Sequence, residues 1–162
     1  MVRHMNLEEQ VDSDFTHARR RALLRRMKAR LRKDLTCNRL LSFDEVKGSL
    51  GAFNQVYLGM RVVPVEKIVG SVNRYRDFDR TFLPVKANLE TKWKRIDRAF
   101  HWSEELPPVS LYKIGEKYFV VDGNHRISVA RYQGVKSIDA EVIEIRSQMP
   151  IAQILERECK EM

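Results

Sequence analysis

The chain has 162 residues, 43% of them apolar, which is enough for one hydrophobic core, so we expect a single folded domain with extensions. Its formal net charge of +8 favours an anionic partner, such as a nucleic acid, a nucleotide or an acidic surface. No apolar run approaches the ~20 residues of a membrane span, and the charged N-terminus lacks a signal peptide's apolar segment, so a soluble, non-secreted protein is expected.

The cysteines and histidines predict no metal site. Cys37 and Cys159 lie far apart and match no zinc or C-x-x-C spacing, which indicates a reducing, cytoplasmic location. The four histidines are scattered along the chain. The sequence also lacks the motifs of P-loop, dinucleotide-binding, zinc-protease and α/β-hydrolase sites.

Residues 7–35 predict one long helix with a basic surface. Its expected apolar stripe consists of Leu24, Met27, Leu31 and Leu35, extended upstream by Phe15, Ala18 and Leu23. Such a helix can contact nucleic-acid phosphates, an acidic membrane or a partner chain, or it can dock through its leucines and leave a solvated basic face. The candidate nucleic-acid-binding residues are the nine cations Arg19, Arg20, Arg21, Arg25, Arg26, Lys28, Arg30, Arg32 and Lys33.

The next segment predicts a short second helix. Residues 42–45 read Ser-Phe-Asp-Glu and fit a capping box, with Leu41 and Val46 placed as a hydrophobic staple, and the helix is expected to end near Gly48. Because these helices show no chemistry beyond charge, residues 1–52 are assigned to a basic helical extension.

A strand and a charged loop follow. The β-branched residues within 60–72 predict a strand with Pro64 near its edge or end. Residues 71–80 are rich in Arg, Asp and aromatic residues without apolar periodicity, which indicates a loop. Its Arg74 and Arg76 can close over a phosphate or stack on a base, although mixed charge in a loop is commonly only solvated.

The second half of the chain predicts alternating helices and strands. Residues 84–102 form an amphipathic helical pattern, with an apolar face of Leu89, Trp93, Ile96 and Phe100. The elements expected after it are strands at 109–114 and 117–121 around a Gly115-Glu116 turn, a helix at 124–133 ended by Gly134, a strand at 137–145 and a last helix opened by Pro150.

Asp122-Gly123-Asn124-His125-Arg126 joins a buried strand to a helix. A strand, a glycine turn and a helix leave the first helical amides free at the end of a sheet, where the helix dipole favours an anion, usually phosphate. Gly123 permits close approach, Arg126 suits bidentate phosphate recognition, and His125 beside Asp122 could act as an acid or base near neutral pH. Asn124 has an alternative role as a helix cap, Asp122 as a cap or an orienting group, and His125 as a simple hydrogen-bond donor.

With this turn, the chain resembles the ParB/sulfiredoxin fold, broadly called the ParB-like nuclease domain, over about residues 60–146. The resemblance rests on residues 62–68, on Pro107-Pro108-Val109, and on residues 118–134, whose turn is similar to the family variant D-G-H-H-R. It implies an α+β fold: a small mixed sheet packed with helices over residues 53–148, with the N-terminal helical extension and a C-terminal helix at 149–162.

In this family the turn holds the phosphates of a nucleotide: CTP in partition proteins, ATP in sulfiredoxins and free-serine kinases. The resemblance therefore implies a nucleoside triphosphate, CTP or ATP with magnesium, bound by Gly123, Asn124, His125 and Arg126, with Arg74 and Arg76 opposite. Asn124 stands at the sulfiredoxin nucleophile position, so sulfinic-acid reductase activity is not expected. The chain ends at Met162, without the helix-turn-helix and dimerisation domains of a full partition protein, and the basic helix could replace the missing DNA-binding part.

Three functions follow from these residues. The leading hypothesis is a ParB-like nucleotide-binding domain whose basic helix contacts DNA or another nucleic acid. The second is a phosphotransferase or nuclease, in which His125 and Asp122 act beside magnesium; Asp77, Asp79 and Glu66 contribute if folding brings them to the turn. The third is a non-catalytic module that forms a homodimer through the N-terminal helix.

Overall fold

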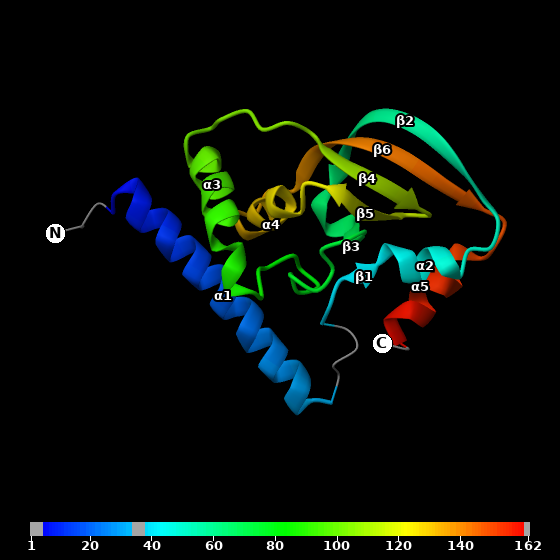
Figure 1. Cartoon of the computed structure of the whole chain (residues 1–162), viewed down its shortest axis with the longest axis horizontal. Coiled ribbons are helices and arrows are strands. Elements are labelled where there is room, and N and C mark those ends of the chain that lie inside the picture. The colour runs from blue at the N-terminus through cyan, green and yellow to red at the C-terminus, as the bar shows by residue number, and fades with distance from the viewer. Residues whose placement is uncertain (1–4, 34–37, 161–162) are drawn as a thin grey trace.

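The computed structural model describes residues 5–33 and 38–160 and contains one six-stranded mixed sheet with helices packed on it (Figure 1). The α+β prediction, with a helix preceding the sheet, is confirmed. The strands are β1 Leu41–Ser42, β2 Phe53–Pro64, β3 Ile68–Ser71, β4 Val109–Ile114, β5 Lys117–Asp122 and β6 Ser137–Ser147. The helices are α1 Leu7–Leu31, α2 Phe43–Gly48, α3 Glu90–His101, α4 Asn124–Tyr132 and α5 Ile151–Lys160. Short 3-10 turns are η2 Val65–Lys67 and η3 Ala87–Leu89. Within the described ranges, no helix is both long and apolar enough to cross a membrane.

The strand order β1-β3-β5-β4-β6-β2 places β5 near the centre of the sheet. β5 pairs in parallel with β3 and antiparallel with β4, while β4 pairs in parallel with β6. The predicted β4–β5 hairpin is confirmed, with Gly115 at a positive φ of 59° in its turn. The carboxyl end of β5 therefore delivers Asp122 and Gly123 directly to α4.

β2 is longer than the sequence predicts. It begins at Phe53 and lies at the sheet edge, antiparallel to β6, with a bulge between Tyr57 and Gly59. The first half escapes prediction because half of its side chains are exposed, none is fully buried, and they show no clear alternation. Pro64 ends the strand, as predicted, because proline has no backbone N–H to continue the ladder.

The segment before residue 52 contributes to the folded core, although the sequence suggests an extension there. β1 pairs in parallel with β3, and Phe43 and Val46 of α2 are buried beside Phe119 and Ile145 of the sheet. The predicted capping box is wrong: Ser42 is the N-cap of α2, but its side chain makes no capping hydrogen bond. Ser42 is instead a buried residue of β1, paired with β3, and this strand role replaces the local capping role.

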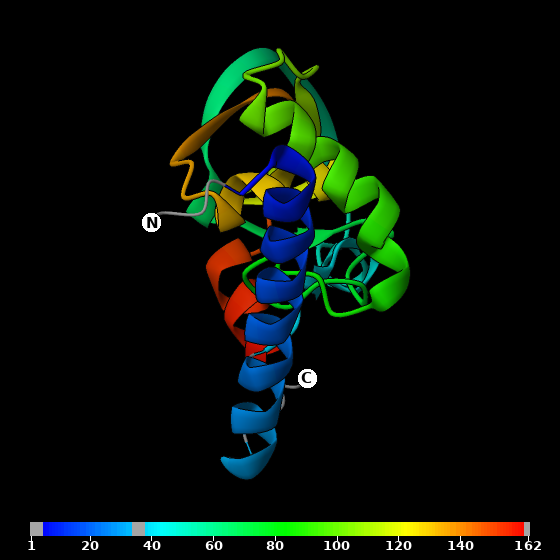
Figure 2. The ribbon, with the colours of Figure 1, turned by 90° about the vertical axis from the view of Figure 1, so that its left-hand side faces the viewer.

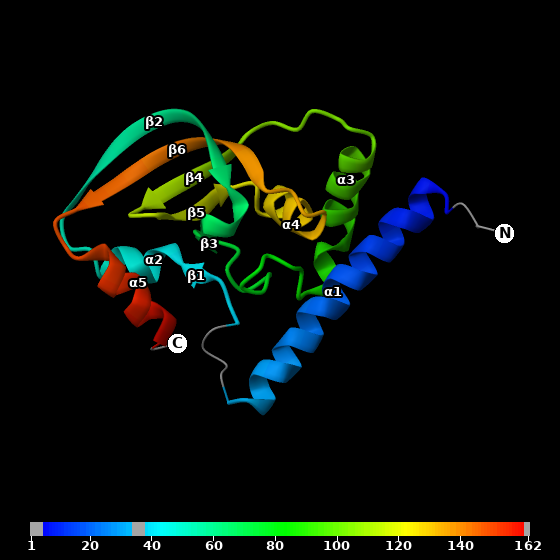
Figure 3. The same cartoon turned by 180° about the vertical axis from the view of Figure 1, so that it is seen from behind.

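The helices form two groups around the sheet (Figures 1 and 3). α2 and α5 pack against one face, where Ile154 is buried in the same cluster as Phe119. α1, α3 and α4 gather on the other side and share a cluster that includes Phe15, Trp93 and Val129. Trp93 Nε1 donates a hydrogen bond of 2.9 Å to the buried Ser128 Oγ, which fixes α3 against α4.

The predicted apolar stripe of α1 is confirmed at Phe15 and Ala18 and is wrong at Leu24, Met27 and Leu31. The buried residues are Val11, Asp14, Phe15, Ala18 and Ala22, all in the first two-thirds of the helix, and the helix ends at Leu31. The small alanines allow close approach to α3 and α4, whereas the larger Leu24, Met27 and Leu31 are 47%, 59% and 84% exposed. Leu35 lies outside the described residues. Figure 2 shows the C-terminal part of α1 extending away from the other helices.

The predicted helix at 84–102 also differs in detail. α3 begins at Glu90 rather than Pro84, after the 3-10 turn, and Phe100 at its end is exposed. Asp97, four residues after Trp93, takes a place on the buried face instead. Burial, only partly offset by a hydrogen bond from Gln133, raises the pKa of Asp97 to about 6.

Phe15→Ala is expected to destabilise the chain by about 3 kcal/mol, because it leaves a cavity between α1 and Trp93. The matched control Leu24→Ala removes a large exposed side chain from the same helix and should change stability by no more than about 0.5 kcal/mol. Urea unfolding measures both free energies. Equal losses for the two variants would contradict the observed docking face of α1.

Candidate functional site

Gly123 is the residue at which β5 becomes α4. It is the N-cap of α4, with φ 108° in the left-handed region. A Cβ built at this position would lie 2.5 Å from Val109 Cγ1 on β4 and 3.1 Å from the Arg126 guanidinium. Both its backbone conformation and its close neighbours therefore require glycine at this position.

The first amides of α4 open into a polar pocket of about 270 Å³. The first helical hydrogen bond runs from Ile127 N to Gly123 O at 3.0 Å, so the preceding amides of residues 124–126 have no partner within the helix. The positive end of the helix dipole faces this pocket. Its other walls come from the loop at Asn73 and Arg74 and from α3.

Besides Arg126, three cationic side chains from the loop after β3 and from α3 converge on the pocket: Arg74, Lys92 and Arg95. Lys92 and Arg95 lie three residues apart on the exposed side of α3, and within the described part of the chain neither has an ion-pair partner. Arg74 donates to Asp77 Oδ2 at 3.0 Å and remains partly exposed. Lys92 and Arg95 are not predicted as site residues, because their helical spacing gives the only signal and many solvated cations share it.

Arg126 fastens the turn to the segment before β4. Its guanidinium donates to Pro108 O at 2.9 Å, to Pro107 O, and to Asp122 Oδ2 at 2.7 Å. The Arg126 charge still borders the pocket, but most of its donors already have protein partners. Asp122 is exposed and pairs with this arginine.

Asn124 ties the turn to the loop that follows β3. Its Oδ1 accepts a hydrogen bond of 2.8 Å from Ser71 Oγ, and both residues are buried. Ser71 Oγ also accepts from the Arg74 backbone N at 3.2 Å, so one hydroxyl positions both sides of the pocket. The alternative in which Asn124 caps α4 is wrong, because Gly123 is the cap and no side chain among the described residues makes a capping hydrogen bond there.

His125 lies between the pocket and the core. Its ring packs edge-to-face on Phe78, with centroids 5.6 Å apart, and its Nε2 is buried without a hydrogen-bond partner among the described residues. Burial, together with the positive charges of Arg74 and Lys92, lowers the pKa of His125 to about 4. The imidazole is therefore neutral at pH 7 and does not titrate near neutral pH as the sequence suggests.

The structure separates several other predicted residues from this pocket. Arg76 lies over the Tyr75 ring, 5.5 Å from its centroid, and lines a different pocket beside Arg26 and Arg30 of α1. Asp77 pairs with Lys86 at 2.6 Å as well as with Arg74. Buried Asp79 pairs with Arg25 at 3.0 Å, and Glu66 lines a third pocket. Within the described residues, the turn therefore gathers no cluster of carboxylates for two metal ions.

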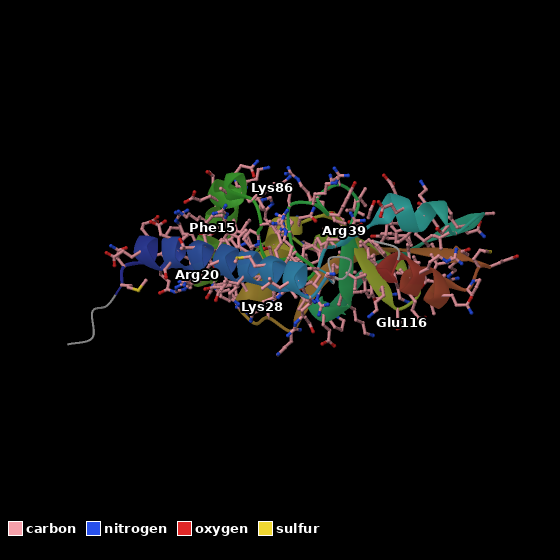
Figure 4. All side chains as sticks on the ribbon, turned by 90° about the horizontal axis from the view of Figure 1, so that it is seen from below. Phe15, Arg20, Lys28, Arg39, Lys86 and Glu116 are labelled. Carbon is pink, nitrogen blue, oxygen red and sulfur yellow. The ribbon has the colours of Figure 1, made fainter. Side chains whose placement is uncertain are left out.

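The nine cations of α1 and its C-terminal end divide into two groups. Arg19 donates to Val85 O at 3.4 Å and Arg25 pairs with Asp79, so both are half-buried contacts to the loop before α3. Figure 4 shows Phe15 and Arg20 on different sides of α1, with Lys28 further along the helix. The exposed members, none of which has an ion-pair partner among residues 5–33 and 38–160, are Arg20, Arg21, Arg26, Lys28, Arg30, Arg32 and Lys33.

No protein-family model and no curated protein matches the sequence. Several solved structures are similar to the chain. A sulfiredoxin from Arabidopsis thaliana has 18% identity and a TM-score of 0.39, covering 61% of this chain and 94% of its own. A Pnob8-like ParB-N domain has 16% identity and a TM-score of 0.39, covering 67% and 38%. A C-terminally truncated chromosome-partitioning protein ParB from Caulobacter crescentus, complexed with CTP-gamma-S, has 20% identity and a TM-score of 0.40, covering 64% and 52%.

The buried neutral state of His125 predicts a pH-dependent stability. The imidazole has a pKa near 6.5 when unfolded and about 4 when folded, so the unfolded chain binds more protons between these values. The stabilisation is complete above pH 6.5 and is lost as the pH falls towards 4. From pH 7 to pH 4 the wild type should lose about 2 kcal/mol more stability than His125→Asn, after allowance for solvent screening. Urea unfolding at both pH values measures the difference, and parallel losses would contradict this assignment.

Proposed function

We propose that the chain binds a nucleotide, with its phosphates at the N-terminus of α4. The observation that carries the proposal is the convergence of Arg74, Lys92 and Arg95 on the same pocket as the free amides of residues 124–126. Amides at a helix N-terminus and cationic side chains both favour negative charge. The resemblance of the turn to the ParB/sulfiredoxin family supports a nucleoside triphosphate as the ligand.

The roles within this proposed site follow from the contacts of each side chain. Lys92 and Arg95 contact phosphate oxygens directly, because their charges are not already neutralised by nearby carboxylates. Gly123 lets the phosphates approach the backbone, while Asn124 and Arg126 hold the turn in position. Neutral His125 supplies a hydrogen-bond donor from the pocket wall.

The nucleoside is proposed to lie along the neighbouring groove. A neighbouring pocket of about 530 Å³ shares Arg95, Ile96 and Arg126 with the pocket at Gly123. It continues past Leu106 and the exposed Trp102. The pocket at Gly123 is small for a whole nucleotide, since small-molecule sites usually measure about 300–1,000 Å³. An apolar groove with an exposed indole beside it suits a nucleobase.

Magnesium would be held mainly by the phosphates and water, with Asp122 as the one carboxylate among the residues described around this pocket. Asp122 is already paired with Arg126. For this reason the phosphotransferase or nuclease alternative has less support than binding alone.

Isothermal titration with CTP, ATP and GTP, with and without magnesium, tests the site. Lys92→Ala and Arg95→Ala should each weaken the binding of the preferred nucleotide by about tenfold or more, because each removes a charge-assisted contact. Lys117→Ala is the matched control, since it removes an exposed cation from the opposite end of β5. The proposal is excluded if no nucleotide gives heat, or if all three variants bind like the wild type.

We further propose that residues 19–33, here called the basic arm, contact a nucleic-acid backbone. Five of the seven exposed cations follow Ala22, the last buried residue of α1, and lie where the helix extends away from the other helices: Arg26, Lys28, Arg30, Arg32 and Lys33. Arg26 and Arg30 also line a pocket of about 470 Å³ with Arg76, which brings the loop arginine to the arm. The exposed apolar residues Leu24, Met27 and Leu31 support the separate expectation that two chains pair through α1, which stays a prediction.

A fourfold variant with Arg26, Lys28, Arg30 and Arg32 changed to alanine tests the arm. The slope of log Kobs against log salt for duplex DNA should decrease by about 3 to 4, because each lost phosphate contact contributes about 0.9. The matched control changes four exposed cations elsewhere, Arg61, Lys117, Lys136 and Arg146, and gives the same net charge of 8 − 4 = +4. Fluorescence anisotropy with labelled DNA, and with RNA as a second probe, measures both slopes. Equal slopes would show that net charge alone attracts nucleic acid.

A further inference from the structure

Three ligand-forming side chains meet where α1 crosses α3. Asp14 comes from α1, while Asp97 and His101 lie four residues apart on α3, and one ligand atom from each falls within 4.8 Å of the others. His101 Nε2 lies 2.9 Å from Asp14 Oδ2 and 3.6 Å from Asp97 Oδ2. This cluster is separate from the pocket at Gly123 and is not used by the proposed function.

The hydrogen bonds of the cluster leave one buried oxygen unsatisfied. Gln133 Nε2 donates to Asp97 Oδ1 at 2.7 Å and to Asp14 Oδ2 at 3.2 Å, and Gln10 donates to Asp14 Oδ1 at 2.9 Å. Asp97 Oδ2 has no hydrogen-bond partner within the described residues, and its side chain is 0% exposed. This oxygen points towards the same imidazole nitrogen as Asp14 Oδ2. A single N–H at His101 Nε2 can make a good hydrogen bond to only one of these two carboxylate oxygens.

We propose that Asp14, Asp97 and His101 form a binding site for a divalent transition-metal ion, with zinc as the best fit. Asp14 Oδ2, Asp97 Oδ2 and His101 Nε2 would coordinate the ion, and water would complete its coordination. It would offset the repulsion between two buried carboxylates and satisfy the unpartnered Asp97 oxygen at the same time.

The distances fit a tetrahedral ion after small adjustments. Zinc bonds of about 2.0–2.1 Å to oxygen and nitrogen place neighbouring ligand atoms roughly 3.3 Å apart. The observed separations of 2.9 and 3.6 Å lie on either side of this value. Magnesium and calcium fit less well, because both prefer six or more oxygen ligands and the histidine offers nitrogen.

The surrounding residues provide support and access. Gln133 would keep its bond to Asp97 Oδ1, the oxygen that does not face the ion, and so orient the carboxylate. His101 is partly exposed and lines a pocket of about 570 Å³, which gives the ion a route from solvent. The bound ion would add a further link between α1 and α3, which the pairs Glu8–Arg98 and Asp12–Lys94 already join.

Zinc titration into the full-length, chelator-treated chain tests this site. Calorimetry should show one saturable zinc per chain, and zinc at about 100 times Kd should raise Tm by about 5 °C or more. Magnesium should do neither. Cobalt should give the visible absorption of a tetrahedral site.

Asp97→Asn and His101→Gln should each weaken zinc binding by more than about 100-fold, and Gln133→Leu by about tenfold. Asp97→Asn removes a buried like-charge contact, so this variant is expected to stay folded without metal, as far-ultraviolet circular dichroism can verify. The matched control His17→Gln changes an exposed histidine of α1 and should bind zinc like the wild type. The proposal is overturned if zinc leaves the wild-type Tm unchanged, or if His101→Gln responds as the wild type does.

Discussion

The abrupt change from strand to helix at Gly123 is the constraint on which the candidate site depends. β5 lies beside β4, and the close approach of Val109 leaves no space for a side chain at the turn. Once the backbone adopts this left-handed conformation, α4 starts at a fixed angle and position relative to the sheet. The hydrogen bonds from Ser71 to Asn124 and from Arg126 to Pro108 then hold the neighbouring loops against the same turn.

A second set of contacts orients α3, the helix that carries Lys92 and Arg95, towards the pocket. Trp93 packs fully buried between α1 and α4, and its bond to Ser128 sets the rotation of α3 about its own axis. With Trp93 turned inward, Lys92 and Arg95 lie on the pocket side of the same helix. Core packing and the charge that faces the pocket are therefore linked through a single helix, and repacking at Trp93 would move both cations.

Local signals predict the central part of this structure well. The Gly115 hairpin, the glycine turn at residue 123 and the end of α4 near Gly134 each depend on a few adjacent residues, and all are found. The docking face of α1 is only partly predictable from hydrophobicity: Phe15 and Ala18 are found on it, but it also uses Ala22 and buried Asp14, while Leu24 and Leu31 are exposed.

The composition of the sites depends on tertiary contacts that the sequence does not display. Arg74 and Arg76 are two residues apart, yet one lines the turn pocket and the other faces α1, because a tight loop sends them in different directions. Asp14 and His101 meet although they are 87 positions apart. No spacing rule covers such a separation, so this cluster becomes visible only after α1 and α3 are docked.

The two edges of the sheet have consequences for association between chains. β1 has two residues, too few to recruit a foreign strand, but the outer side of the twelve-residue β2 pairs with no other strand in the described part of the chain. The bulge between Tyr57 and Gly59 interrupts the regular register of that edge, and Gly59 has a φ of 71°. A bulge increases the local twist, so an incoming strand could not pair along the full length of β2. The irregularity thus protects the longest exposed edge from amyloid-like sheet extension.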